Sequence, residues 1–306
     1  MIPKEYQKYE QVVTVACVNF NPVWGDKEAT LEKIKANIVE AAAQGSNIII
    51  FPEDALVGAT CSEENRLENE PCRMHRDNAE TVPGPSTQEV ACLAKEYDVY
   101  VIFGMPEQEK TNPDIRYNAV AVVGPEGILG TYRKLNIISF HRPVATLPAI
   151  TEDVCFTQGS ELPVWETRYG PIGIQICYDF WLHPELSRIQ ALKGARLIIN
   201  CTASVVGPAK TEFMIQQTGA RATENCVYTA SANLVGEVGS HAYYGHSTIA
   251  GPAFPRLNHI YAEGGDGEEI VTATLSFEKL HRWHEVADWR KLRRSELIAC
   301  EFQSLL

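Results

Sequence analysis

Three ionisable side chains in this 306-residue chain each stand directly beyond a predicted strand. Glu53 follows "IIIFP", Lys134 closes "LGTYRK" and Cys177 follows "IGIQI". In α/β proteins the carboxyl ends of the strands form the edge at which ligands and catalytic groups gather. We therefore expect these side chains, which come from three separate segments, to converge at one edge of a sheet.

A carboxylate, an ammonium and a thiol at one place predict a specific chemistry. A thiol needs a base that removes its proton before it attacks, and a cation stabilises the negative charge that develops on the attacked group. Taken singly, the glutamate could be a solvated turn residue, the lysine a surface charge and the cysteine a core residue. Their shared placement favours the catalytic interpretation, because a core cysteine requires neither an acid nor a lysine beside it.

The composition predicts a soluble globular protein and excludes several classes. Hydrophobic residues make up 45% and charged residues 22% of the chain, and the formal net charge is −12. A chain with this negative charge repels the phosphate backbone of a nucleic acid, and we therefore expect no nucleic-acid partner. The start "MIPKEYQKYE" lacks the apolar core of a secretory signal, and no apolar stretch approaches the roughly 20 residues that span a bilayer. These features predict a cytoplasmic protein without a membrane partner.

Cysteines and histidines show no spacing typical of a metal site or a disulfide framework. The nine cysteines are an odd number without a C-x-x-C pair, which predicts reduced intracellular thiols. The segments "HAYYGHS" and "HRWH" lack acidic or thiol partners at ligand spacing, so we interpret their histidines as structural or exposed. The sequence therefore predicts no metal and no cofactor.

Strand and helix patterns alternate along most of the chain. The β-branched run 12–20 predicts a buried strand, and apolar residues at helical spacing predict a helix over 26–44 that ends at Gly45. Further helices are predicted over 85–97, from Pro184 and over about 210–224, and further strands over 47–51, 99–104, 118–124, 127–134, 162–167, 172–176, 195–200 and 226–235. This order predicts one α/β domain over 1–275, with two packed sheets or one large sheet, and a tail over 276–306.

The three motifs also resemble those of a known family. "FPEDAL", "YRKLN" and "GIQICYDFWLHPE", in this order and at these separations, are similar to the Glu, Lys and Cys motifs of the nitrilase superfamily, the carbon–nitrogen hydrolases. The likeness extends from "VACVNFNPVWGDKEATLEKI" to "ARATENCVYTASAN". It implies an α-β-β-α sandwich whose subunits pair into an αββα–αββα homodimer or a higher homo-oligomer. The alternating charges of the tail, with Trp283 and Trp289, indicate that the tail lies at the interface.

The resemblance also implies a role for each residue. Cys177 corresponds to the nucleophile, Glu53 to the general base and then acid, and Lys134 to the cation that stabilises the oxyanion. Glu152, seven residues before Gly159, corresponds to the second glutamate that many family members carry. The backbone N–H of Tyr178 follows the nucleophile directly, so we expect it to be the second oxyanion donor.

Residues near the cysteine bear on the substrate. The order Cys177-Tyr178-Asp179 resembles amidases and carbamoylases, whereas true nitrilases usually carry Cys-Trp-Glu. Relatives that bind carboxylates often place arginines just after this motif, where this chain has Phe180, Trp181 and Leu182. We therefore expect a neutral, apolar or aromatic amide. The predicted substrate-binding residues are Tyr178, Trp181, Thr202 and Ala203.

The resemblance therefore implies a cysteine hydrolase that cleaves a linear amide through a thioester and releases ammonia and a carboxylic acid. The alternatives are an N-carbamoyl amine hydrolase, which also releases carbon dioxide and an amine, a nitrilase or an acyltransferase. A non-catalytic scaffold is the remaining hypothesis, and the intact Glu, Lys and Cys set disfavours it.

Overall fold

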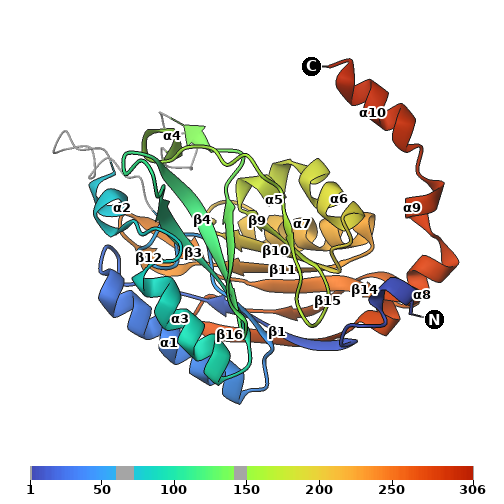
Figure 1. Cartoon of the computed structure of the whole chain (residues 1–306), viewed down its shortest axis with the longest axis horizontal. Coiled ribbons are helices and arrows are strands. Elements are labelled where there is room, and N and C mark those ends of the chain that lie inside the picture. The colour runs from blue at the N-terminus through green and yellow to red at the C-terminus, as the bar shows by residue number, and fades with distance from the viewer. Residues whose placement is uncertain (1, 60–71, 141–149, 306) are drawn as a thin grey trace.

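Two six-stranded sheets form the centre of the computed structural model, which describes residues 2–59, 72–140 and 150–305 (Figure 1). The strands of the first sheet are, in spatial order, β16 (Glu269–Ser276), β1 (Val12–Asn19), β2 (Ile48–Ile50), β3 (Tyr100–Gln108), β4 (Arg116–Gly124) and β5 (Gly127–Arg133). Those of the second sheet are β15 (Arg256–Glu263), β14 (Thr248–Ala253), β11 (Tyr228–Asn233), β10 (Leu197–Thr202), β9 (Ile172–Ile176) and β8 (Val164–Trp165). Two small hairpins pair β6 (Ser139–Phe140) with β7 (Ile150–Thr151), and β12 (Val235–Val238) with β13 (His241–Tyr244).

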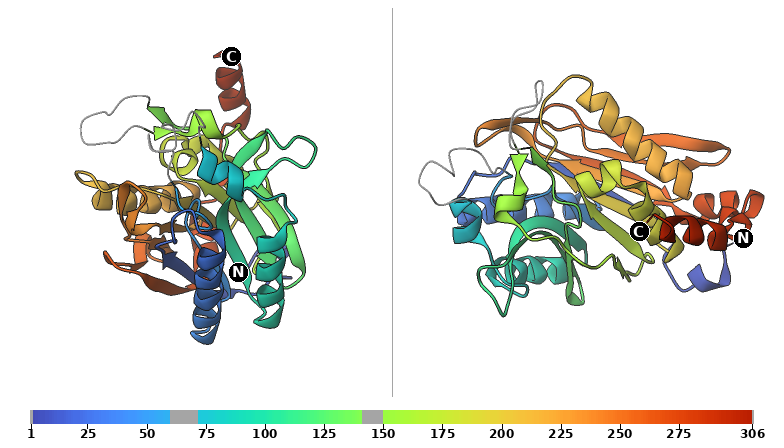
Figure 2. Two further views of the ribbon diagram at one scale, coloured as in Figure 1. Left: turned by 90° about the vertical axis from the view of Figure 1, so that its left-hand side faces the viewer. Right: turned by 90° about the horizontal axis from the view of Figure 1, so that it is seen from above.

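Helices cover the outer face of each sheet (Figure 2). Those on the first sheet are α1 (Lys27–Ala43) and α3 (Pro85–Glu96), and those on the second are α6 (Pro184–Leu192) and α7 (Lys210–Asn225). The shorter or terminal helices are the 3₁₀ helix Lys4–Tyr6, α2 (Arg73–Asn78), α4 (Glu152–Cys155), α5 (Tyr178–Leu182), α8 (Phe277–Val286), α9 (Trp289–Leu292) and α10 (Ser295–Gln303). The layers confirm the predicted α-β-β-α sandwich, with two packed sheets. The pairing of two such subunits stays a prediction.

The alternating direction of side chains along each strand explains why the sheets pack on both faces. On β1, Val13 and Val15 join Ile174 of the second sheet in the core between the sheets. Their neighbours Ala16 and Val18 join the separate core beneath α1 and α3. Successive strand residues point to opposite faces, so an unbroken apolar run buries side chains on both sides at once.

The first helix begins and ends where its sequence predicts. The Asp26 side chain accepts a hydrogen bond from the Ala29 backbone N–H at 3.0 Å, which caps the first turn. Gly45 follows the last turn with φ at 85°, a conformation that costs glycine little. The helix therefore delivers the chain directly into β2, the strand that precedes Glu53.

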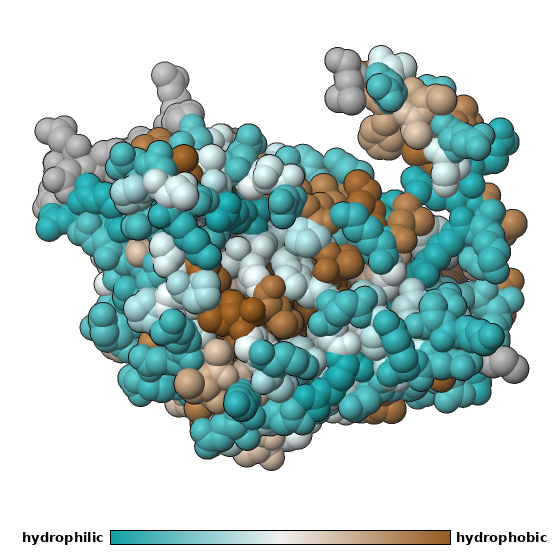
Figure 3. Space-filling model, viewed as in Figure 1, coloured by the Kyte–Doolittle hydropathy of each residue, from teal (hydrophilic) through white to brown (hydrophobic). Residues whose placement is uncertain are grey.

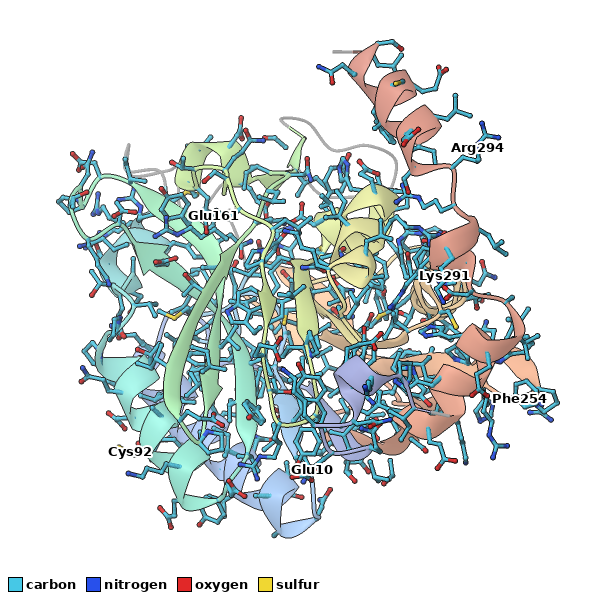
Figure 4. All side chains as sticks on the ribbon, turned by 45° about the vertical axis from the view of Figure 1, so that its right-hand side comes forward. Glu10, Cys92, Glu161, Phe254, Lys291 and Arg294 are labelled. Carbon is cyan, nitrogen blue, oxygen red and sulfur yellow. A yellow bond between two sulfur atoms is a disulfide. The ribbon has the colours of Figure 1, made fainter. Side chains whose placement is uncertain are left out.

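The C-terminal segment divides into a docked helix and an extended arm. Phe277 and Leu280 of α8 are buried in the core between the sheets. No residue of α9 or α10 is fully buried, but Trp289 of α9 packs against the body, with the Arg188 guanidinium 4.2 Å from its ring centroid. After Arg294, which Figure 4 labels, α10 extends away from the body. The domain boundary at residue 275 stays a prediction. Within the described residues, the structure contains no helix that is both long and apolar enough to cross a membrane.

One expectation about the cysteines is wrong. Cys72 and Cys155, which are 83 residues apart in the sequence, form a disulfide with their Cα atoms 5.5 Å apart. Both side chains are buried beside Phe156. The sequence could not predict this bond, because neither cysteine has a partner at a recognisable spacing and only the fold brings them together. Cys92, labelled in Figure 4, is an exposed free thiol.

The disulfide should stabilise the fold measurably. It closes a loop of 83 residues, for which we expect a contribution on the order of 2–5 kcal/mol to the free energy of unfolding. Urea denaturation of the oxidised protein, the reduced protein and Cys72→Ser checks this, with Cys92→Ser as the control that should leave stability unchanged. Equal stability with and without reductant would contradict the expectation.

Candidate active site

Cys177 lies at a sharp turn between β9 and α5. Its backbone has φ 47° and ψ −101°, a conformation that non-glycine residues rarely adopt and that costs on the order of 1–3 kcal/mol. The turn is held because the Cys177 N–H donates to the Cys201 carbonyl at 2.9 Å and to Asn200 Oδ1 at 3.0 Å. In turn, the Cys177 carbonyl accepts the Trp181 N–H at 2.9 Å. The thiol is thereby presented at the end of the second sheet.

Lys134 extends β5 by one residue and turns its side chain into the interior. Its N–H donates to the Asn118 carbonyl at 2.9 Å, and its carbonyl accepts the Gly159 N–H at 2.7 Å. The side chain is almost completely buried, with 1% exposed. Its Nζ lies 2.7 Å from Glu53 Oε1, 2.7 Å from Glu152 Oε1 and 2.9 Å from Glu152 Oε2. One ammonium therefore joins two carboxylates from distant segments.

Glu53 is placed by the turn that follows β2. Gly104 of β3 lies against this turn, where an added Cβ would collide with the Pro52 carbonyl and the Asp54 N–H, so glycine is required. Besides Lys134, the Glu53 carboxylate accepts the Ala203 N–H on Oε2 at 2.9 Å. Ala203 follows β10, so this bond connects the first sheet to the second beside Cys177.

Glu152 begins the short helix α4 and faces Lys134. Its Oε2 also accepts the Ile138 N–H at 3.0 Å. The structure thus brings together the side chains of Glu53 and Lys134, two of the three residues expected to converge from their strand-end placement, with Glu152, which the family resemblance implied. Cys177 lies close enough for the charges of all three to act on its thiol.

Asn118 is a member of this cluster that the sequence analysis missed. Its Nδ2 donates to Glu53 Oε1 at 2.8 Å and to Glu152 Oε1 at 3.3 Å, and the residue is fully buried on β4. An amide within the otherwise apolar run "NAVAVVG" was the available signal, since a buried polar side chain needs a partner.

Burial and neighbouring charges perturb the acid–base behaviour of the cluster. Burial raises the pKa of the Cys177 thiol to about 12, with a further rise from Glu53 and an opposing effect from Lys134. Burial would lower the pKa of Lys134, but the carboxylates of Glu152 and Glu53 raise it well above its ordinary value. Burial also raises the pKa of Glu152, against the effect of Lys134. At neutral pH the thiol therefore holds its proton, and a base must remove it.

The residues predicted to bind substrate lie around the turn. Trp181 is buried against Phe180 and Phe213, and its Nε1 donates to Thr202 Oγ1 at 3.2 Å. Thr202 is itself buried, and the Ala203 N–H binds Glu53 as described above. The Tyr178 ring packs edge-on against His183. Their contacts with a substrate stay predictions. Among the described residues, no group of His, Cys, Asp or Glu side chains is arranged to hold a metal ion.

Comparisons with known proteins identify the family. The carbon-nitrogen hydrolase family model matches residues 14–285. The omega-amidase NIT2 of Xenopus tropicalis is 31% identical over 282 residues, covering 90% of this chain and 93% of that protein. The probable nitrilase C965.09 of Schizosaccharomyces pombe is 33% identical over 242 residues, covering 78% and 80%. The crystal structure of Saccharomyces cerevisiae Nit3, a nitrilase-superfamily member, is similar with a TM-score of 0.78 at 24% identity, covering 94% and 98%.

The chain therefore belongs to the carbon–nitrogen hydrolase family, within the nitrilase superfamily. This confirms the resemblance drawn from the three motifs. Membership at this level means hydrolysis of a carbon–nitrogen bond in the manner of an amidase.

Replacing Lys134 by Met should destabilise the fold in a pH-dependent way. The variant buries two carboxylates without their counter-ion, so we expect the free energy of unfolding at pH 7.5 to fall by about 3–5 kcal/mol. The pKa of Glu152, raised by burial, rises further once the charge of Lys134 is lost. A carboxyl group with a raised pKa in the folded state favours folding at low pH and loses that contribution as pH rises through the folded pKa. The difference in the free energy of unfolding between wild type and Lys134→Met should therefore be smaller at pH 5 than at pH 7.5.

Urea denaturation of wild type and Lys134→Met at pH 5 and pH 7.5 measures this deficit. The double variant Lys134→Met/Glu152→Gln is the matched control, because it removes one of the two stranded charges. It should recover part of the lost stability at pH 7.5. A deficit of the same size at both pH values would contradict the expected charge balance.

Proposed function

We propose that this protein hydrolyses a linear amide through a thioester on Cys177, releasing ammonia and a carboxylic acid. The observation that carries the proposal is the buried ammonium of Lys134, 2.7 Å from a carboxylate oxygen of both Glu53 and Glu152 and acting on the Cys177 thiol. The kinship with omega-amidases supports the same reaction class.

The first half of the reaction forms the thioester. Glu53 accepts the proton of the Cys177 thiol, whose raised pKa keeps it protonated until the substrate is in place. The sulfur attacks the amide carbon, and the developing oxyanion is stabilised by the Lys134 ammonium and the Tyr178 N–H. The carbon–nitrogen bond then breaks, and Glu53 returns the proton to the departing ammonia.

The second half of the reaction uses a solvent water molecule. Glu53 takes one proton from this water, whose oxygen attacks the thioester carbon, and the carbon–sulfur bond breaks. The carboxylic acid leaves, and the proton returns from Glu53 to the Cys177 sulfur. Glu152 keeps Lys134 charged and in place throughout, since both of its carboxylate oxygens accept hydrogen bonds from the ammonium.

The surroundings of α5 favour a neutral substrate. Phe180 and Trp181 are buried and apolar where related enzymes that bind carboxylates often place arginines. The guanidinium that does contact this segment, Arg221, donates to the Phe180 and Trp181 carbonyls at 3.0 and 2.9 Å and pairs with Glu224. Three of its five N–H donors are therefore engaged within the protein, and its charge already has a carboxylate partner in Glu224.

Removing the nucleophile should abolish turnover, and removing its base should strongly reduce it. We expect Cys177→Ala to lose ammonia release, and Glu53→Gln to retain its fold but lose about 10²- to 10⁴-fold in kcat. The measurement is ammonia release from a panel of primary amides, with mass spectrometry of the intact protein to detect an acyl group on the thiol. Cys92→Ala, which changes an exposed thiol, is the control. Undiminished ammonia release from Cys177→Ala would overturn the proposal.

The same assay separates the neighbouring activities. Carbon dioxide together with ammonia from N-carbamoyl amines would indicate a carbamoylase, and ammonia from nitriles a nitrilase. Capture of the acyl group by an added amine in place of water would indicate an acyltransferase. No turnover and no covalent adduct with any substrate would indicate a non-catalytic scaffold.

We also propose that the protein is a cytoplasmic homo-oligomer whose C-terminal arm contributes to the interface. Leu297 and Phe302 on α10 are exposed by 50% and 57%, and Figure 3 shows apolar side chains among the polar ones of this arm. Isolated in water, such a helix leaves apolar area uncovered that a second copy of the chain can bury.

Adding charge to the apolar side chains of the arm should therefore weaken the oligomer. Light scattering after size-exclusion chromatography should give a smaller molar mass for Leu297→Glu/Phe302→Glu than for wild type. Glu301→Gln, on the same exposed helix, is the control that should leave the mass unchanged. An unchanged mass for the double variant would exclude the arm from the interface.

A further inference from the structure

Besides Glu53 and Glu152, a third buried carboxylate lies close to Cys177 and has no place in the reaction described above. Asp179 follows Cys177 by two residues and is completely buried, with 0% exposed. Its Oδ2 accepts the Tyr132 hydroxyl at 2.7 Å and the Leu135 N–H at 3.0 Å. Its Oδ1 accepts the backbone N–H and the side-chain amide of Asn136 at 2.8 and 2.7 Å.

These four contacts all use the Asp179 side chain as an acceptor. Three of the partners are N–H groups, which can only donate, and the fourth is a hydroxyl; a carboxylate offers the four acceptor positions that they occupy. None of the four donors carries a charge, so the carboxylate is buried without a counter-ion among them. Such burial is costly unless the hydrogen bonds are complete, which makes this arrangement sensitive to any change of the side chain.

The four donors come from the segment that carries Lys134. Leu135 and Asn136 follow Lys134 directly, and Tyr132 lies two residues before it, on β5 of the first sheet. Asp179 belongs to α5, which continues β9 of the second sheet. One side chain thus connects the strand end that presents the ammonium to the turn that presents the thiol.

We infer that Asp179 is a positioning residue that holds the Lys134 segment against Cys177 across the two sheets. The inference rests on the proposed function, because it assigns Asp179 a part in placing two of its reacting groups. The backbone of Lys134 itself bonds Asn118 and Gly159, neither of which belongs to the second sheet, so Asp179 connects the backbone of this segment to α5 after the second sheet. Misplacing a catalytic group by about 1 Å can cost on the order of 100-fold in rate, so a single link of this kind has a large effect.

Asp179→Asn tests the inference with the smallest change of shape. In this variant an NH2 group replaces one of the two carboxylate oxygens. It faces N–H or O–H groups that donated to that oxygen, so the hydrogen bonds to that position are lost. We expect kcat for the best amide to fall by about 10- to 100-fold and KM to change by less than about threefold, because Asp179 touches the Lys134 segment rather than the predicted pocket residues. The rate of Cys177 alkylation by iodoacetamide should fall as well, since Lys134 lowers the pKa of that thiol.

Milder and matched variants separate positioning from stability. Tyr132→Phe and Asn136→Ala each remove one donor and should reduce kcat by about two- to tenfold, and they keep the test valid if Asp179→Asn does not fold. Glu80→Gln is the matched control. Its carboxylate is also buried, but it bonds Ser86 at the start of α3 and Lys27 at the start of α1. It should lower the melting temperature without changing the kcat or the alkylation rate.

The outcomes distinguish this inference from the proposed function. Alkylation of Cys177 is located by mass spectrometry and needs no knowledge of the physiological substrate. If the wild type turns over no amide and forms no acyl group on Cys177, the proposed function fails and the inference fails with it. If wild type is active and the Asp179, Tyr132 and Asn136 variants behave as Glu80→Gln does, the role of Asp179 alone is overturned.

Discussion

The arrangement of this site depends on one buried ammonium held between two carboxylates. Lys134 is 1% exposed and bonds Glu53 and Glu152, so the cation would be prohibitively costly to bury without either partner. Burial and the neighbouring Glu53 raise the pKa of the Cys177 thiol, and the nearby lysine offsets them only in part. In the proposed mechanism, Glu53 removes that proton when a substrate is in place.

The packing of the two sheets brings together catalytic side chains that lie on different sheets. Glu53 and Lys134 follow β2 and β5 of the first sheet, whereas Cys177 follows β9 of the second. Two hydrogen-bonded links cross between the sheets near these residues, from Ala203 to Glu53 and from Asp179 to Leu135 and Asn136. A rigid packed core between the sheets holds the remaining geometry, because close-packed interiors transmit displacements rather than absorb them.

Much of the fold and the centre of the site could be predicted from local patterns. Apolar runs and the Asp26 and Gly45 signals predicted β1, α1 and β2 to within a residue or two, because each depends on neighbours in the sequence. Asn118 was missed, since a lone amide in a strand has many possible partners. The late strands β12 to β16 were not assigned individually, because strands such as β15 expose many of their side chains and alternate weakly. The Cys72–Cys155 disulfide was predicted wrongly as two free thiols.

By itself the sequence determined which chemical groups stand at strand ends, and with them the class of reaction. A glutamate, a lysine and a cysteine beyond apolar runs are local facts, and so is the absence of arginine immediately after Cys177. Only the tertiary structure decided how these groups are paired and charged. Hydrogen bonds such as those of Asn118 and Asp179, and the disulfide, join residues 34 to 83 positions apart. Distances across such separations follow from the packing of two sheets, which no local pattern encodes.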